Sequence, residues 1–214
     1  MYVQDRMTKN PFTVKREQSI SDAREILKRE NIRRLPVIDA HGHLTGILTE
    51  KDILQASPSP ASTLDVWEIS ALLANMKVKD VMTANPVNCH PATPVEEAAR
   101  VLRDRSIGGL PVVTEGELVG IITESDLFEI FIEMFASREK GLRLTALLPH
   151  VPGELANFAG AVRDAGGDIL AFGTVRGSAP TNRMGIVKVS GLSQDDLLHA
   201  VQPFVQEVLD LREL

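Results

Sequence analysis

The apolar and polar positions of this chain follow one pattern twice. Apolar residues from Ile20 to Leu27 recur at helical spacing after Ser19, which is expected to cap the helix. A second helix is expected to begin near Asp52. Short apolar runs predict strands around the first helix, at residues 12–14, 35–38 and 44–48. This part of the chain is therefore predicted to be β-α-β-β-α.

The same order returns in residues 78–137, which indicates an internal duplication. Leu35-Pro36-Val37 matches Leu110-Pro111-Val112, and a strand that ends in Thr-x-x-Asp follows each triplet. In the second copy, Thr93 is expected to cap the helix, and a short strand is expected at residues 87–89. The fold class predicted from this alternation is α/β (α+β).

The last third of the chain does not match the repeat. Its strands are predicted at residues 142–148, 168–176, 184–190 and 205–211, with helices at 154–165 and 195–201. The resulting order, β-α-β-β-α-β, is that of the split-βαβ (ferredoxin-like) motif. The expected domains are residues 1–56 (first repeat), 57–77 (linker and helix), 78–137 (second repeat), 138–142 (linker) and 143–214.

Two helical segments outside the common pattern allow more than one interpretation. The stiff break at Ser57-Pro58-Ser59-Pro60 precedes a predicted helix from Leu64 to Met76, in which Trp67 is expected to pack rather than to stack on a base. After Asp126, a helix predicted to reach about Ser137 has a broad apolar face. This face is interpreted either as core or as a dimer contact, and the sequence leaves both open.

Composition narrows the class of protein. Of 214 residues, 43% are hydrophobic and 24% are charged, which is ordinary for a globular protein. The net charge of −6 argues against a nucleic-acid partner, since phosphate binding favours a basic face. The single cysteine, Cys89, excludes a disulfide within the chain and a four-cysteine metal site. No apolar stretch indicates a signal peptide or a membrane helix, so a cytoplasmic location is expected.

The repeated Thr-x-x-Asp ending offers the strongest candidate chemistry. Thr49 and Thr123 each end a strand beside the unpaired N–H groups of a following helix, a corner suited to an anion. Asp52 and Asp126 would repel phosphate, but each carboxylate can accept hydrogen bonds from a ribose diol. The alternative is that these residues only cap their helices. The presence of two copies favours the site.

The duplicated unit resembles the CBS domain, which occurs in pairs. The resemblance is based on Asp5-Arg6-Met7-Thr8 with Asn10-Pro11, on the Leu-Pro-Val triplets, and on Gly46–Asp52 with Gly120–Asp126. It implies an adenosyl ligand (AMP, ADP, ATP or S-adenosylmethionine) in the clefts between repeats. The residues that it implies are Thr49 and Thr123 facing phosphate, Asp52 and Asp126 facing ribose, and Val14 and Cys89 bordering adenine.

Arg33 and Arg34 precede the first Leu-Pro-Val and could add charge-assisted contacts to phosphate. The alternative is that they form a solvated helix end. Their counterparts in the second repeat, Gly108 and Gly109, have no charge. We therefore expect two unequal sites, with the phosphate-rich ligand in the first-repeat site.

The last third resembles an ACT domain, through Pro152-Gly153-Glu154-Leu155 and Gly166-Gly167-Asp168-Ile169. ACT domains bind small effectors at a dimer interface, and His150, Gly153 and Asp168 are the residues that this resemblance implies. Asp168 replaces the Asn often found there, so dimerisation is the favoured role. The whole combination is similar to AcuB-type acetoin-utilisation proteins.

No catalytic or metal constellation is found in the sequence. His41 and His43 lie in a predicted hairpin turn whose second copy has no histidine, and His90 and His199 have no evident partner. No phosphate-binding glycine motif occurs. We therefore expect a non-enzymatic regulator that forms a homodimer, binds an adenosyl ligand and is compatible with a regulated enzyme partner. The alternative is a structural adaptor without a nucleotide ligand.

Overall fold

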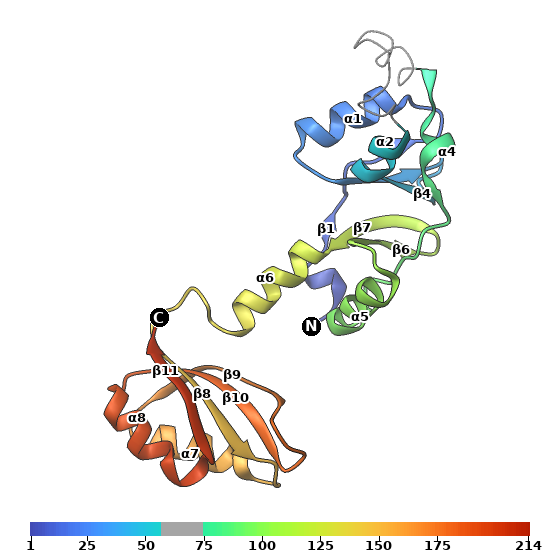
Figure 1. Cartoon of the computed structure of the whole chain (residues 1–214). Coiled ribbons are helices and arrows are strands. Elements are labelled where there is room, and N and C mark those ends of the chain that lie inside the picture. The colour runs from blue at the N-terminus through green and yellow to red at the C-terminus, as the bar shows by residue number, and fades with distance from the viewer. Residues whose placement is uncertain (57–74) are drawn as a thin grey trace. The chain divides into compact units, whose positions relative to one another are not determined.

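The computed structural model describes residues 1–56 and 75–214 and divides into two compact units, residues 1–127 and 128–214 (Figure 1). The boundary between the units falls inside helix α6 (Glu124–Met134). The predicted break at Ser57–Pro60, Trp67 and most of the predicted helix 64–76 lie outside the described residues.

The first repeat consists of two short helices and a small sheet. Ser19 caps its first helix as predicted, because its Oγ accepts a hydrogen bond from the backbone N–H of Asp22 at 3.1 Å. One strand lies parallel and one antiparallel to the central strand of the sheet. In chain order the elements are β2 (Val14–Lys15), α1 (Ile20–Arg29), β3 (Arg34–Ile38), β4 (Leu44–Thr49) and α2 (Glu50–Ala56).

The second repeat has the same order with local differences. The predicted strand at residues 87–89 is wrong, since only Cys89 forms a bridge, to Val112. Thr93 is not the N-cap: Pro94 occupies that position, and Thr93 Oγ1 accepts from the N–H of His90 at 3.2 Å. The elements are α4 (Val78–Val81), β5 (Thr83–Ala84), α5 (Val95–Arg105), β6 (Gly109–Thr114), β7 (Glu117–Thr123) and α6.

The opening segment of each repeat pairs with and packs against the other repeat. Strand β1 (Thr8–Lys9) pairs with β7, and β5 pairs with β4; Figure 1 shows β1 beside β7. The fully buried Val3, in the short 3-10 helix η1 (Val3–Asp5), packs in the core of the second repeat. Val78, equally buried, packs in the core of the first repeat. Each repeat therefore completes the core and the sheet of the other.

The two hairpin turns make a second reciprocal contact. The N–H of Leu44 donates to the carbonyl of Gly116 at 3.1 Å, and the N–H of Leu118 donates to the carbonyl of Gly42 at 3.2 Å. Gly42 and Gly116 have φ angles of 88° and 89°, which glycine adopts without the steric cost of a Cβ atom. These bonds join the repeats at the end of each sheet.

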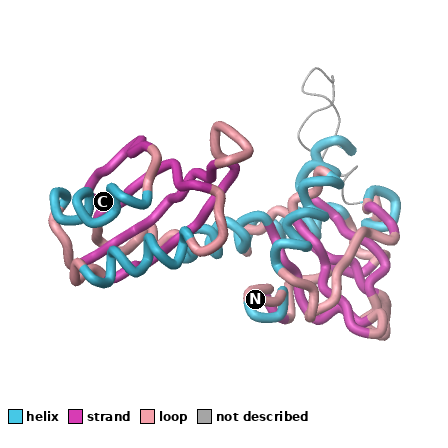
Figure 2. Tube along the Cα trace, turned by 90° about the horizontal axis from the view of Figure 1, so that it is seen from below, coloured by secondary structure: helices cyan, strands magenta, loops and turns pink. Residues whose placement is uncertain are grey.

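The second unit has the predicted order of strands and helices around one antiparallel sheet. Its strands lie side by side in the order β11-β8-β10-β9. Helices α7 and α8 cover one face of this sheet (Figure 2). Leu144 and Val187 belong to the core on that face. Phe158 and Leu197 fill the core between helices and sheet. The elements are β8 (Leu142–Pro149), α7 (Glu154–Asp164), β9 (Asp168–Arg176), β10 (Asn182–Ser190), α8 (Gln194–Val201), the 3-10 helix η2 (Gln202–Phe204) and β11 (Glu207–Glu213).

Helix α6 has the broad apolar face that the sequence predicts, and this face is partly covered. Of the predicted face, Ile130 is buried and Leu127 packs against the core of the second repeat. In contrast, Phe131 is 59% exposed and Met134 is 65% exposed. The described parts of the chain therefore use one part of this face as core and leave Phe131 and Met134 exposed. None of the helices in residues 1–56 and 75–214 is long and apolar enough to cross a membrane.

The exchange of opening segments predicts where a cavity mutation acts. We expect Val3→Ala to lower the free energy of unfolding by about 2 kcal/mol, because it removes two buried methyl groups. In hydrogen exchange measured by mass spectrometry, β6 and β7 should lose protection, although Val3 is in the first repeat by sequence. Val78→Ala should instead affect β3 and β4. Val151→Ala, at a site 55% exposed, is the control. If Val3→Ala instead lowered the protection of β3 before that of β6 and β7, the exchange of opening segments between the repeats would be contradicted.

Candidate functional site

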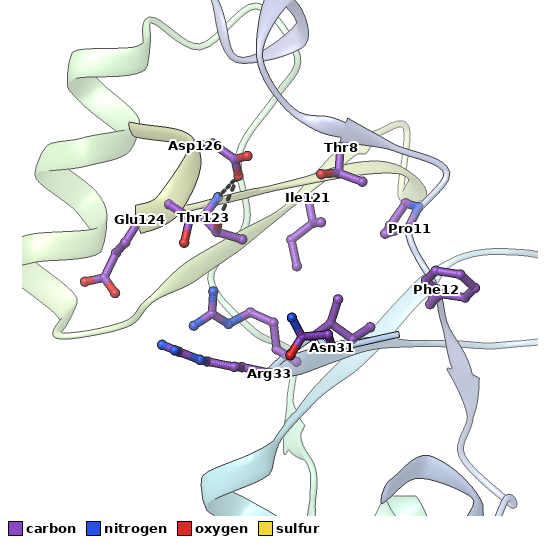
Figure 3. A pocket seen from close by; sticks show the side chains of 12 residues that line it. Thr8, Pro11, Phe12, Asn31, Arg33, Ile121, Thr123, Glu124 and Asp126 are labelled. Carbon is purple, nitrogen blue, oxygen red and sulfur yellow. Dashed lines mark hydrogen bonds between the residues drawn. The ribbon is translucent and has the colours of Figure 1, made fainter. Parts of the chain in front are cut away.

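Two cavities in the first unit contain the two Thr-x-x-Asp endings. One, of about 350 Å³, includes Thr123 and Asp126 and is called the second-repeat cavity (Figure 3). The other, of about 450 Å³, includes Thr49 and Asp52 and is called the first-repeat cavity. The structure therefore places all four predicted Thr and Asp residues at cavity walls.

The two cavities correspond position by position. Each takes a strand end and the following helix from one repeat, and the segment before Leu-Pro-Val from the other repeat. Five of these matched positions differ in residue type, and they determine how the cavities differ. In each of the following pairs the first residue lines the second-repeat cavity and the second is its counterpart in the first-repeat cavity: Phe12 and Val87, Asn31 and Ser106, Arg33 and Gly108, Arg34 and Gly109, and Ser125 and Lys51.

Thr and Asp form a cap at the start of each helix. Asp126 Oδ2 accepts hydrogen bonds from both the N–H and the Oγ1 of Thr123, each at 2.7 Å (Figure 3). Asp52 Oδ2 does the same for Thr49, at 2.8 and 2.7 Å, and the N–H of Asp52 donates to Thr49 Oγ1 at 3.2 Å. The helices α2 and α6 begin at Glu50 and Glu124, two residues before these aspartates, which agrees with the predicted starts near Asp52 and Asp126.

Capping and ligand binding are compatible at these residues. The cap engages Oδ2 of each aspartate, whereas Oδ1 makes no hydrogen bond within the described ranges. Fixing one carboxylate oxygen also fixes the direction of the other, which prepares it to accept from a ligand hydroxyl. The Thr-x-x-Asp residues can therefore cap their helices and bind a ligand at the same time.

Arg34 crosses from the first repeat to the second. Its Nη1 donates to the carbonyl of Gly108. A Cβ atom at Gly109 would lie 2.8 Å from Arg34 Cδ, so the glycine leaves room for the arginine stem. Burial lowers the pKa of the Arg34 guanidinium, and the nearby carboxylate of Glu124 opposes that shift. The positions of Gly108 and Gly109 are therefore next to a positive charge. This corrects the expectation that this segment is uncharged because its two residues are glycines.

Charge still distinguishes the two cavities, for a different reason than the sequence suggested. Arg33 and Arg34 line both cavities, so neither arginine belongs to one site. Each cavity also contains two carboxylates, from its Thr-x-x-Asp aspartate and the preceding helix-start glutamate. Only the first-repeat cavity adds a third cation, Lys51, where the second-repeat cavity has Ser125.

Val14 and Cys89 do not line either cavity. Val14 is buried in the core of the first repeat, and Cys89 packs against the core of the second. The apolar walls come from Phe12 and Val87 instead, two residues earlier in each repeat. The strand that begins at Val14 turns this residue inward, whereas Phe12 precedes the strand and is half exposed.

Thr8 and Thr83 also line the cavities and were not predicted as site residues. Each belongs to the segment that is exchanged between repeats, so each reaches the cavity of the other repeat's Thr-x-x-Asp. The matched Met-Thr-x-Asn-Pro sequences were the available signal. Sequence alone could not show that strand β1 pairs with β7.

The structure does not bring His150, Gly153 and Asp168 together within one chain. His150 follows β8 beside the start of β10, where its Nδ1 lies 3.3 Å from the carbonyl oxygen of Pro180. Gly153, with φ of 89°, precedes α7 at that same end. Asp168 pairs with Ser190 at the other end of β10, about 27 Å away for a strand of this length.

A family model described as the CBS domain matches residues 3–59 and 78–133, more than half of the chain. A CBS domain-containing protein of Dictyostelium discoideum is 36% identical over 133 residues, covering 62% of this chain and 92% of that protein.

Two enzymes are similar over a small part of their length. The L-aspartate semialdehyde sulfurtransferase of Methanocaldococcus jannaschii is 33% identical over 60% of this chain and 23% of the enzyme. The inosine-5'-monophosphate dehydrogenase of Bifidobacterium longum is 30% identical over 92% of this chain and 34% of the enzyme. This chain therefore spans a quarter to a third of the enzymes it matches.

Three solved structures resemble the chain over about two thirds of its length. A Vibrio cholerae protein assigned to acetoin utilization (AcuB) has a TM-score of 0.54 and 32% identity, covering 64% of this chain and 95% of that chain. CBSX2 in complex with AMP has a TM-score of 0.54 and 31% identity, covering 62% and 97%. The CBS domain pair of protein MJ0100, with 5'-methylthioadenosine and S-adenosyl-L-methionine, has a TM-score of 0.52 and 30% identity, covering 65% and 98%.

The caps predict a stability cost that is independent of any ligand. We expect Asp52→Ala and Asp126→Ala each to lower the free energy of unfolding by about 1 kcal/mol, because each leaves the Thr N–H and hydroxyl without their acceptor. Denaturant unfolding without nucleotide measures this cost. Ser125→Ala, in the same turn, serves as control and should change stability by less than about 0.5 kcal/mol. Unchanged stability in both Asp variants would refute the cap.

Burial predicts that Cys89 is chemically inert in the folded protein. Burial raises the pKa of the Cys89 thiol to about 11. A free thiol has a pKa of about 8.5, so at pH 8 the folded chain should present roughly two-hundredfold less thiolate than the unfolded chain. Alkylation with iodoacetamide, followed by mass spectrometry, should be slower by at least that factor. Equal rates in native buffer and in denaturant would show that the thiol is accessible.

Proposed function

Because this chain belongs to the CBS-domain family, we propose that its two repeats bind an adenosyl ligand between them and that the chain acts as a regulator. The single observation that supports this most is the position-by-position match of the two cavities. Each combines a Thr at a helix start, an aspartate with one oriented free oxygen, and an apolar wall. Such a cavity can accept phosphate, ribose and base together.

The first-repeat cavity is proposed to take the more highly charged ligand. It has three cations, Arg33, Arg34 and Lys51, against two carboxylates, whereas the second-repeat cavity has only the two arginines. Its volume, about 450 Å³ compared with 350 Å³, also favours the larger ligand. ATP or ADP is therefore assigned to the first-repeat cavity. The second-repeat cavity, with Phe12 as its wall, suits AMP or the less anionic S-adenosylmethionine.

Relatives support the ligand class. The solved complexes of CBSX2 with AMP and of the MJ0100 domain pair with S-adenosyl-L-methionine show that both kinds of adenosyl ligand occur in similar proteins. The enzyme names among the relatives belong to proteins of which this chain matches a minor part. We therefore propose regulation of an enzyme partner rather than catalysis by this chain.

The second unit is proposed to be an ACT domain that makes the protein a homodimer. Support comes from its β-α-β-β-α-β order along the chain. Its first strand, β8, also lies inside the sheet, between the last strand, β11, and β10. The exposed face of α6, with Phe128 and Met134, is a second surface that a partner copy could cover. A link to acetoin utilisation has the similarity to the Vibrio cholerae protein as its only support.

Calorimetric titration of the full chain with AMP, ADP, ATP and S-adenosylmethionine tests the proposal. We expect Asp52→Ala and Asp126→Ala each to weaken adenosyl binding at one site. Lys51→Ser, which gives the first repeat the residue of the second, should weaken ATP binding by about three- to tenfold and AMP binding by less. Lys140→Ser, outside both cavities, is the matched control.

The adaptor alternative makes opposite predictions for the same samples. If no adenosyl ligand binds below about 1 mM, a CBS pair with this site chemistry is not a nucleotide sensor. In that case no nucleotide would raise the melting temperature, and the Asp variants would leave the oligomeric state unchanged in light scattering. A Lys51→Ser variant that binds ATP as tightly as the original chain would overturn the assignment of ATP to the first-repeat cavity alone.

A further inference from the structure

Three cations lie in one row on the sheet of the second unit. Arg143 of β8 is directly opposite Lys188 of β10 on one side and Arg212 of β11 on the other. Directly opposite residues of antiparallel strands project from the same face. Their neighbours Leu144 and Val187 project to the helix-covered core, so the cation row is on the face that α7 and α8 do not cover. Like charges in such a row repel one another, which requires an explanation.

The carboxylates on this face do not balance the row. Asp210 is the one acidic side chain in the described ranges that pairs with any of the three cations. It lies 2.6 Å from Arg212 Nη2 and 3.5 Å from Arg143 Nη1. The pKa of Asp210 is lowered chiefly by its hydrogen bond from Arg212. Asp210 is therefore committed to Arg212, which leaves Arg143 and Lys188 in excess.

Lys188 is the most unusual member of the row, because it is only 3% exposed. Its Nζ donates one hydrogen bond, to the carbonyl of Ala136 at 3.1 Å, and within the described parts of the chain it has no carboxylate partner. An ammonium group has three donors, and burying its charge without a counter-ion is costly. Two donors of a desolvated cation thus remain for an anion.

A cavity of about 170 Å³ opens beside these cations. Lys188, Arg143 and Ile186 line it from the sheet, and the aromatic pair Phe131 and Phe135 line it from α6 and the residue that follows α6. The two rings lie 4.8 Å apart. Phe135 is seated on Gly173, where a Cβ atom would lie only 2.8 Å from the ring. The cavity therefore combines two cations with apolar side chains, of which Phe135 is held against Gly173.

We propose that this cavity binds a small organic anion, a monocarboxylate with a short apolar chain. The carboxylate accepts hydrogen bonds from Lys188 and Arg143, and the apolar part contacts Phe135 and Ile186. The cavity has less than half the volume of either adenosyl cavity, which excludes a nucleotide. The site is separate from His150, Gly153 and Asp168, and it does not depend on the proposed nucleotide binding.

Calorimetry on the full chain at constant ionic strength tests this site, with acetate, butyrate and inorganic phosphate as probes. We expect saturable binding of butyrate, weaker binding of acetate, and no binding of phosphate at the same concentration. Lys188→Met keeps the length of the buried stem but removes the charge, so it should weaken butyrate binding by at least about tenfold. Arg163→Met, at a side chain 77% exposed, is the matched control.

A second variant keeps the proposal testable if Lys188→Met does not fold. Ile186→Phe retains both cations but fills the cavity, so it should abolish butyrate binding while circular dichroism remains unchanged. Equal butyrate affinity in the original chain and in either folded variant would overturn the site. Phosphate that binds as tightly as butyrate would overturn the carboxylate class, and absence of binding by all three probes would overturn the proposal as a whole.

Discussion

The first unit depends on the exchange of two short segments between its repeats. Val3 and Val78 are both fully buried, and each fills the core of the repeat that it does not belong to by sequence. Strands β1 and β5 extend the same exchange to the sheets. Because the opening segments cross, Thr8 and Thr83 each enter the cavity built on the other repeat's Thr-x-x-Asp. The cavities therefore exist only when both repeats are folded together, which gives a ligand bound there a means to stabilise the pair.

Duplication produces two similar cavities, and a few substitutions make them unequal. Arg34 occupies space that Gly109 leaves free, and its guanidinium lies beside the boundary between both cavities. The difference in charge consequently depends on Lys51 in the first-repeat cavity rather than on the arginines. Under the proposed function, two unequal sites can respond to two adenosyl ligands at once, or to one ligand over a wider range of concentration.

The second unit uses the two faces of one sheet differently. One face is covered by α7 and α8 and packs Phe158 and Leu197 against apolar strand residues. The other presents Lys188, Arg143 and Arg212 in one row. A row of like charges lowers stability unless something neutralises it, so its presence on a partly buried face indicates a binding role more than a structural one. Period-two alternation of residues 142–148 indicates that two faces exist, but it does not show which charged residues of different strands become neighbours.

The sequence by itself determined the duplication, the order of elements in the second unit and most of it in the first, the Ser19 cap and the Thr-x-x-Asp corners, because these follow from local spacing and local hydrogen bonds. Only the tertiary structure decided which segments are shared: that β1 joins β7, that Phe12 and Val87 line the cavities in place of Val14 and Cys89, and that Arg34 reaches Gly108. It also separated Asp168 from His150 and aligned the three cations. The physical reason is that pairing between distant strands and the direction of a long side chain depend on packing across the fold, which local pattern does not encode.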